Sequence, residues 1–177
     1  MATELCPGAV LSGATIRGLV ASEPPLVSAV RDLDRQLQPN GIDLTLASVW
    51  RWTGRGQLGT ADGDRTLPDR VEVAPDGDGY YELPPGGYVV LLNEVVNLPT
   101  DLMAFGRPRS SLLRCGVALH TAVWDAGYSG RSESLLIVYN PAGARLRRDA
   151  RILQLVFCAL DRPTEPYAGR FQNENLG

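Results

Sequence analysis

The sequence contains no lysine, and all 17 of its basic residues are arginine. A Schiff-base lysine and the lysine of a Walker-type phosphate loop are therefore excluded. One histidine, His120, and three widely spaced cysteines without a CxxC pair do not supply the closely spaced ligands of a structural zinc site. No apolar run approaches the roughly 20 residues of a membrane span, and the N-terminus lacks the basic and apolar regions of a signal peptide. We therefore expect a cytoplasmic protein with reduced thiols and no membrane partner.

The composition is that of a soluble globular protein. Its 177 residues fit one domain with a core of its own, and 44% of them are hydrophobic and 21% charged. The net charge of −3 argues against a nucleic-acid partner bound by a basic surface. The 19 glycines and 13 prolines favour turns and short strands over long helices.

The N-terminal part, residues 10–37, has a helical pattern. Ser12 can cap a first helix, and the prolines at 24 and 25 interrupt the chain. Residues 26–37 then carry apolar side chains at alternating spacings of three and four, which predicts a second helix.

Beyond residue 40 the patterns predict strands. Residues 42–46 alternate apolar and polar, as in a half-buried strand. Residues 53–79 are rich in Gly, Asp, Pro and Arg and predict a surface loop or hairpin. A strand, a turn and a second strand are expected over 80–92, and further strands over 135–139 and 151–160. The whole chain, 1–177, is predicted to be a single β domain with a polar tail over 165–177.

A candidate anion site lies within residues 107–116. Ser110 or Ser111 can cap one helical turn, and Gly116 suits its left-handed end. The free N–H groups of such a turn, with two hydroxyls, Arg109 and Arg114, are typical of phosphate binding. The alternative is a capped surface turn with solvated arginines.

A candidate catalytic group lies within residues 122–130. Asp125 follows an apolar run and precedes a glycine turn, where a carboxylate can take a proton from water while an aromatic neighbour stacks on a sugar or base. The alternative is a turn aspartate that bonds its own backbone. Asp43 is open to the same interpretation. Arg131 and Glu133 share one strand face and are expected to pair, and the cysteines are expected in the core.

Four segments, in order, resemble the motifs of the dUTPase and dCTP deaminase superfamily. They are QPNGIDLTL (38–46), the stretch that ends in PRSSLLRCG (108–116), TAVWDAGYSGRSE (121–133) and ARILQLVF (150–157). With the tail YAGRFQNENLG (167–177), the pattern is most similar to archaeal-type dUTPases. The resemblance implies an all-β, β-clip or distorted jelly-roll-like dUTPase fold with short N-terminal helices. It also implies a homotrimer with shared active sites, whose substrate is a pyrimidine deoxynucleoside triphosphate. Mg²⁺ would be held through phosphates and water, with no direct protein ligand.

The resemblance also assigns roles to residues. Asp125 falls on the aspartate that activates water, and Tyr128 on the ring that packs against deoxyribose. Asp43 falls on a supporting aspartate of the first motif. The substrate-binding positions are Arg109, Ser110, Ser111, Arg114 and Gln154, with Arg170, Phe171 and Gln172 in a tail that closes over the site.

The choice between deaminase and diphosphatase depends on one glutamate. Deaminases of this superfamily place it on the strand after the Asp125 segment, where counting gives Leu135 or Ile137. Glu133 could reach that position only if a β-bulge absorbed the extra residues. We therefore expect hydrolysis of dUTP to dUMP and pyrophosphate. The alternatives are a dCTP deaminase, a bifunctional deaminase and dUTPase that uses Glu133, or a non-catalytic nucleotide-binding regulator. The segment 121–125 lacks the glycine usual in the family's base-reading hairpin, yet the archaeal-type pattern favours dUTP over dCTP.

Overall fold

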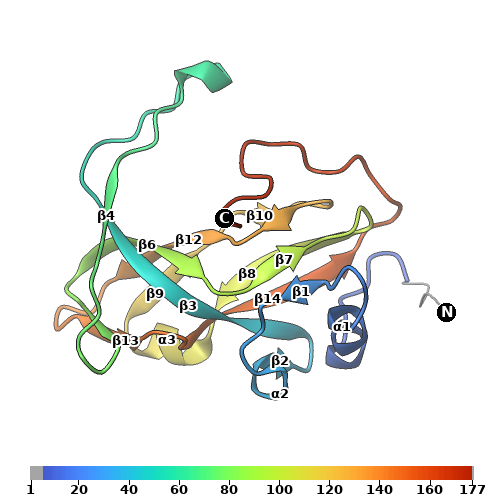
Figure 1. Ribbon diagram of the computed structural model, residues 1–177, viewed down its shortest axis with the longest axis horizontal. Helices are drawn as coiled ribbons and strands as arrows, with labels where there is room; N and C mark the ends of the chain where they lie inside the picture. Colours follow the sequence, from blue (N-terminus) through green and yellow to red (C-terminus); the bar gives the residue numbers. More distant parts are fainter. Residues whose placement is uncertain (1–5, 177) are drawn as a thin grey trace.

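The computed structural model describes residues 6–176 as strands curled into sheets, with few and short helices (Figure 1). This confirms the predicted all-β fold class. Residues 1–5 and 177, the ends of the predicted single domain, lie outside the described part. None of the described helices is long and apolar enough to cross a membrane. The elements in chain order are α1 (Gly13–Val20), β1 (Val27–Ser28), α2 (Leu33–Gln36), β2 (Leu37–Gln38), β3 (Gly41–Trp52), the 3-10 helix η1 (Asp62–Asp64), β4 (Arg70–Glu72), β5 (Tyr80–Leu83), β6 (Gly86–Leu92), β7 (Val95–Asn97), β8 (Leu102–Pro108), α3 (Ser110–Arg114), β9 (Val117–His120), β10 (Val123–Trp124), β11 (Ser129–Gly130), β12 (Glu133–Val138), β13 (Ala144–Arg147) and β14 (Arg151–Ala159).

The main sheet is ordered β10-β8-β14-β3-β6-β12-β9, and β2 and β4 also pair with β3. Smaller sheets are formed by β1-β7-β11 and by β13-β5. The core therefore lies around β3, whose neighbours β14 and β6 run antiparallel to it.

β3 is buried on both faces, where alternation predicted a half-buried strand. Ile42, Leu44 and Leu46 are buried as expected, but Asp43 and Thr45 are buried as well. Thr45 is satisfied internally, because Glu94 accepts hydrogen bonds from the Thr45 N–H at 2.8 Å and the Thr45 hydroxyl at 2.7 Å.

The helix predicted over 26–37 is wrong for most of its length. α1 forms as expected, with the Ser12 hydroxyl accepting from the Thr15 N–H. Val27, however, lies in β1 opposite Val96, and Ala29 has a left-handed φ of 56°. Only α2, capped by Asp32, is helical. Pairing with a strand 69 positions away (Val27 to Val96) buries the apolar residues that the local spacing assigned to a helix face.

Residues 53–69 form an exposed hairpin that projects from the body, and we call it the arm (Figure 1). Gln57 and Thr66 pair across it, and β4 returns along β3 at its base. The predicted surface hairpin is therefore confirmed. The strands expected over 80–92 also form, but they do not pair with each other: β5 joins β13, and β6 joins β3 and β12.

Candidate functional site

The turn that carries Asp125 joins β10 to β11 and rests on buried aromatic side chains. Trp124 and Tyr128 are buried on either side of it, whereas Asp125 is exposed. The Tyr128 N–H donates to the Asp125 carbonyl at 3.1 Å. The main chain thus closes the turn, and the Asp125 carboxylate faces solvent from a fixed position.

A chain of hydrogen bonds runs beneath this turn. Trp124 Nε1 donates to Ser132 Oγ at 2.6 Å, and the Ser132 and Tyr128 hydroxyls lie 2.9 Å apart. The Tyr128 hydroxyl donates to Glu174 Oε1 at 2.8 Å. Because Trp124 donates to Ser132 and Tyr128 donates to Glu174, the Ser132 hydroxyl is the donor and the Tyr128 oxygen the acceptor in the bond between them. Burial raises the pKa of Tyr128 above its ordinary value, so the phenol stays neutral and remains a donor.

Asp125 and Tyr128 line a cavity of about 160 Å³ between β10, β12 and the tail. Its other lining residues are Ala122, Val123, Trp124, Ser132, Glu133, Tyr167, Phe171 and Glu174. Because the sequence resemblance predicts that Asp125 and Tyr128 meet the nucleotide, we refer to it as the nucleoside cavity. Aromatic rings beside polar groups provide the mixed lining that a planar base and its sugar require.

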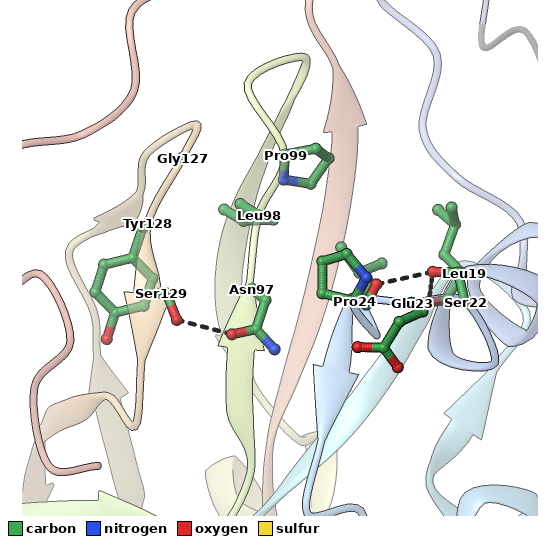
Figure 2. Close-up of a pocket in the computed structure, with 11 residues that line it drawn as sticks. Leu19, Ser22, Glu23, Pro24, Asn97, Leu98, Pro99, Gly127, Tyr128 and Ser129 are labelled. Atoms are coloured by element: carbon green, nitrogen blue, oxygen red, sulfur yellow. Dashed lines mark hydrogen bonds between the residues drawn. The ribbon is translucent and has the colours of Figure 1, made fainter. Parts of the chain in front are cut away.

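A larger cavity of about 490 Å³ lies on the other side of the same turn (Figure 2). Its walls come from α1, the segment after it and the end of β7, and Ser129 Oγ donates to Asn97 Oδ1 at 2.8 Å. Of the residues predicted to bind substrate, only Tyr128 lines it. The smaller cavity, which holds Asp125, is therefore the better candidate site.

The predicted phosphate-binding residues gather at the far end of β8. Arg109 Nε lies 2.9 Å from Asp43 Oδ2, and Arg151 Nη1 lies 3.3 Å from the same oxygen. Gln154 is the cross-strand partner of Asp43 on one side and of Arg107 on the other. Burial raises the pKa of Asp43, while the two guanidinium groups act in the opposite direction. Asp43 thus orients two arginines, and its Oδ1 is buried with no hydrogen-bond partner among the described residues.

The helix cap in this segment differs from the prediction. The N-cap of α3 is Arg109, without a side-chain capping bond, so Ser110 and Ser111 are the first two helical residues. Both serines are exposed, and their hydroxyls face solvent instead of closing the helix. Arg114 Nη1 donates back to the Ser110 carbonyl at 3.1 Å. Gly116 has the expected left-handed φ, at 73°.

The fold of the single chain does not bring the two groups of predicted site residues together. Trp124, next to Asp125, pairs with Ala104 on β8, and Arg109 lies five residues further along the chain. At about 3.3 Å per strand residue, the two groups are separated by roughly 16 Å.

The tail lies on the Asp125 turn of its own chain (Figure 1). The Tyr167 N–H donates to the Ala126 carbonyl at 2.8 Å, and the Asn173 N–H donates to the Ser129 carbonyl at 2.7 Å. The Gln172 side chain bonds the Ser129 N–H and the Gly127 carbonyl. Phe171 lines the nucleoside cavity. Arg170 lines a neighbouring cavity of about 610 Å³ between the tail and the base of the arm.

β12 contains no bulge that would move Glu133. Its register with β6 is continuous from Glu133 opposite Leu91 to Val138 opposite Gly86. Leu135 and Ile137 therefore remain at the two positions where the sequence alignment of the motifs places the deaminase glutamate. Glu133 lies at the start of the strand, and both its oxygens are held by Arg70, at 2.6 and 2.7 Å. The expected pairing of Glu133 with Arg131 is wrong, because Arg70 returns on β4 to take that place.

Sequence reasoning missed Arg70, Arg151, Ser132, Tyr167 and Glu174. Arg70 and Glu133 are 63 positions apart, and Tyr128 and Glu174 are 46 apart, so no local pattern could join them. The expectation of core cysteines is also wrong for Cys6 and Cys115, which are exposed. Among residues 6–176, no three potential His, Cys, Asp or Glu ligands gather into a metal-binding group.

Comparison with known proteins gives a consistent result. The family model described as dCTP deaminase-like matches residues 10–160. A Methanosarcina mazei protein named probable deoxyuridine 5'-triphosphate nucleotidohydrolase is 48% identical over 168 residues, covering 94% of this chain and 98% of that protein. An Archaeoglobus fulgidus protein of the same name is 49% identical over 168 residues, covering 95% and 98%.

A solved structure agrees with the family match. The crystal structure of 2'-deoxycytidine 5'-triphosphate deaminase from Agrobacterium tumefaciens superimposes with a TM-score of 0.66 at 25% identity, over 87% of this chain and 49% of that one. The family match spans most of the sequence, and the archaeal relatives are alike almost from end to end. The chain therefore belongs to the dCTP deaminase-like family.

Proposed function

We propose that the protein is a dUTP diphosphatase, which hydrolyses dUTP to dUMP and pyrophosphate by attack of water on the α-phosphate. Two features together carry this proposal. The Asp125 carboxylate is exposed, and β12 has Leu135 at the position where a deaminase needs a glutamate. The names of the archaeal relatives support the same reaction.

Asp125 would act as the general base. Its carboxylate is exposed at the rim of the nucleoside cavity, where it can hold a water molecule and accept its proton as the phosphorus is attacked. Tyr128 would pack its ring against the deoxyribose, and the hydrogen bonds to Ser132 and Glu174 keep that ring in place.

Arg109, Ser110, Ser111 and Gln154 would bind the triphosphate. Arg109 is already oriented by Asp43, and the serine hydroxyls are exposed beside it. Guanidinium and hydroxyl donors stabilise the charge that develops on phosphate oxygens during displacement.

Mg²⁺ is the proposed cofactor. The ion would arrive with the nucleotide and be held by phosphate oxygens and water. When bound, the ion would neutralise charge on the phosphates.

We also propose a homotrimer whose sites are shared between subunits. The support is the roughly 16 Å between Asp125 and the Arg109 cluster within one protomer. A second protomer that presents its Arg109 end to this Asp125 turn would complete the site.

The three free cysteines fit a reducing compartment, which favours the cytoplasm.

The test is one set of incubations with Mg²⁺ and dUTP, dCTP, dTTP or UTP, with pyrophosphate and ammonia both measured. Pyrophosphate from dUTP without ammonia is the expected result, and little turnover of UTP would support Tyr128 as the ring that excludes a 2'-hydroxyl. Ammonia from dCTP would contradict the proposal and point to Glu133. Binding of dUTP without any turnover would indicate a nucleotide-binding regulator.

A further inference from the structure

Arg70, at the base of the arm, makes the bidentate ion pair nearest to the nucleoside cavity. Its Nη1 and Nη2 donate to Glu133 Oε2 and Oε1 at 2.6 and 2.7 Å, and its guanidinium lies 5.0 Å from the centre of the Trp50 ring. The Arg70 and Glu133 side chains are only 32% and 28% exposed. The ion pair with a carboxylate and the contact with an aromatic ring together restrict the position of this guanidinium.

The cation is needed there because two further carboxylates line the nucleoside cavity besides Asp125. Glu133 enters it from β12 and Glu174 from the tail. Burial raises the pKa of Glu174 and the nearby charge of Glu133 raises it further, while the hydrogen bond from Tyr128 and the charge of Arg70 lower it. Without Arg70, docking the tail would bring the Glu174 carboxylate close to a Glu133 carboxylate that has lost its cation, in a partly buried space.

The ion pair also contacts the tail directly. Asn175 Nδ2 donates to the Arg131 carbonyl at 2.9 Å and reaches Glu133 Oε1 at 3.4 Å. The Arg131 N–H donates to the Glu174 carbonyl at 2.9 Å. One guanidinium therefore connects the base of the arm to the start of β12 and, through Glu133, to Asn175 in the tail.

We propose that Arg70 is a positioning residue for the nucleotide: by neutralising Glu133 it lets the tail dock and keeps Phe171 over the nucleoside cavity. This inference rests on the proposed function for its effect on the substrate. Arg70 acts through Glu133 and the tail, so it sets how well dUTP is held rather than how fast it reacts.

The test uses the full chain and three variants, Arg70→Met, Glu133→Gln and the double variant. Arg70→Met should raise KM for dUTP about tenfold, the scale of losing one charge-assisted contact, with kcat changed far less. It should also speed amide exchange of residues 171–176 in the protein without nucleotide. The double variant should recover much of both effects, because it removes the unpaired carboxylate as well.

Arg145→Met is the matched control. Arg145 pairs with Asp76 and Glu82 at 2.6 Å and lies 4.0 Å from the centre of the Tyr80 ring, in the sheet of β13 and β5 away from the tail. It should leave tail exchange and KM unchanged. Unchanged tail exchange in Arg70→Met would overturn the inference, as would a double variant no better than Arg70→Met. The exchange measurement needs no substrate, so it tests the inference even if dUTP proves not to be hydrolysed.

Discussion

At the scale of single residues, Asp125 is the proposed general base: its own carbonyl closes the turn by accepting from the Tyr128 N–H, and its side chain is exposed. Asp125→Asn keeps the shape of the side chain and removes the base. We expect kcat for dUTP to fall about 10²- to 10⁴-fold, with the affinity for a non-hydrolysable dUTP analogue largely kept. Pyrophosphate release and calorimetric titration would measure the two quantities. Asp78→Asn, in an exposed turn, is the control, and near-normal turnover in Asp125→Asn would show that another group activates water.

Glu174 should make the stability of the protein depend on pH. Burial raises the pKa of Glu174 above its ordinary value of 4.5, so the folded state holds this proton more tightly than the unfolded state. The stabilisation is complete below the unfolded pKa and is lost as the pH rises through the folded pKa. Glu174→Gln can still accept from Tyr128 but does not titrate.

The stability of Glu174→Gln relative to the natural protein should therefore increase as the pH rises. Urea unfolding from about pH 4.5 to about pH 8 would measure this difference. A difference that does not change with pH would show that the hydrogen bond from Tyr128 and the charge of Arg70, which lower the pKa of Glu174, offset the effects of burial and of Glu133.

At the scale of elements, the Asp125 turn packs closely against the tail at Gly127. Its φ is 79°, and a β-carbon there would lie 2.5 Å from Pro166 Cβ. Gly127→Ala should lower the free energy of unfolding by about 1–3 kcal/mol and raise KM for dUTP as the tail is displaced. Thermal unfolding and steady-state kinetics would check both. Gly77→Ala, in open space without a positive φ, should change neither. Normal KM in Gly127→Ala would mean that tail docking does not affect substrate binding.

The same scale shows what local sequence can predict. Ser12 and Gly116 mark real helix ends, because the hydrogen bonds that close these two ends involve only neighbouring residues. The helix expected over 26–37 gives way to β1 because the distant strand β7 buries Val27. Asp125 and Arg109 stand out by residue type and turn chemistry, whereas the pairing of Arg70 with Glu133 exists only because the arm returns along β3.

At the scale of the whole molecule, the distance between Asp125 and Arg109 bears on assembly. If each site takes Asp125 from one subunit and Arg109 from another, two inactive variants can complement each other. Asp125→Asn removes the proposed general base from a site. Arg109→Gln, which can still donate to Asp43, removes the guanidinium that would bind the triphosphate.

Equal amounts of the two variants, unfolded together and refolded, should recover about a quarter of normal activity. Half of the Asp125 positions and, independently, half of the Arg109 positions would be intact in a randomly mixed oligomer. Each variant refolded alone gives the baseline, and Asp125→Asn mixed with the doubly substituted chain should stay inactive. Light scattering would give the number of subunits in the same samples. A mixture no more active than the baseline would show that Asp125 and Arg109 of one site come from the same protomer. The Arg109 end of β8 would then have to move toward Asp125 within that protomer.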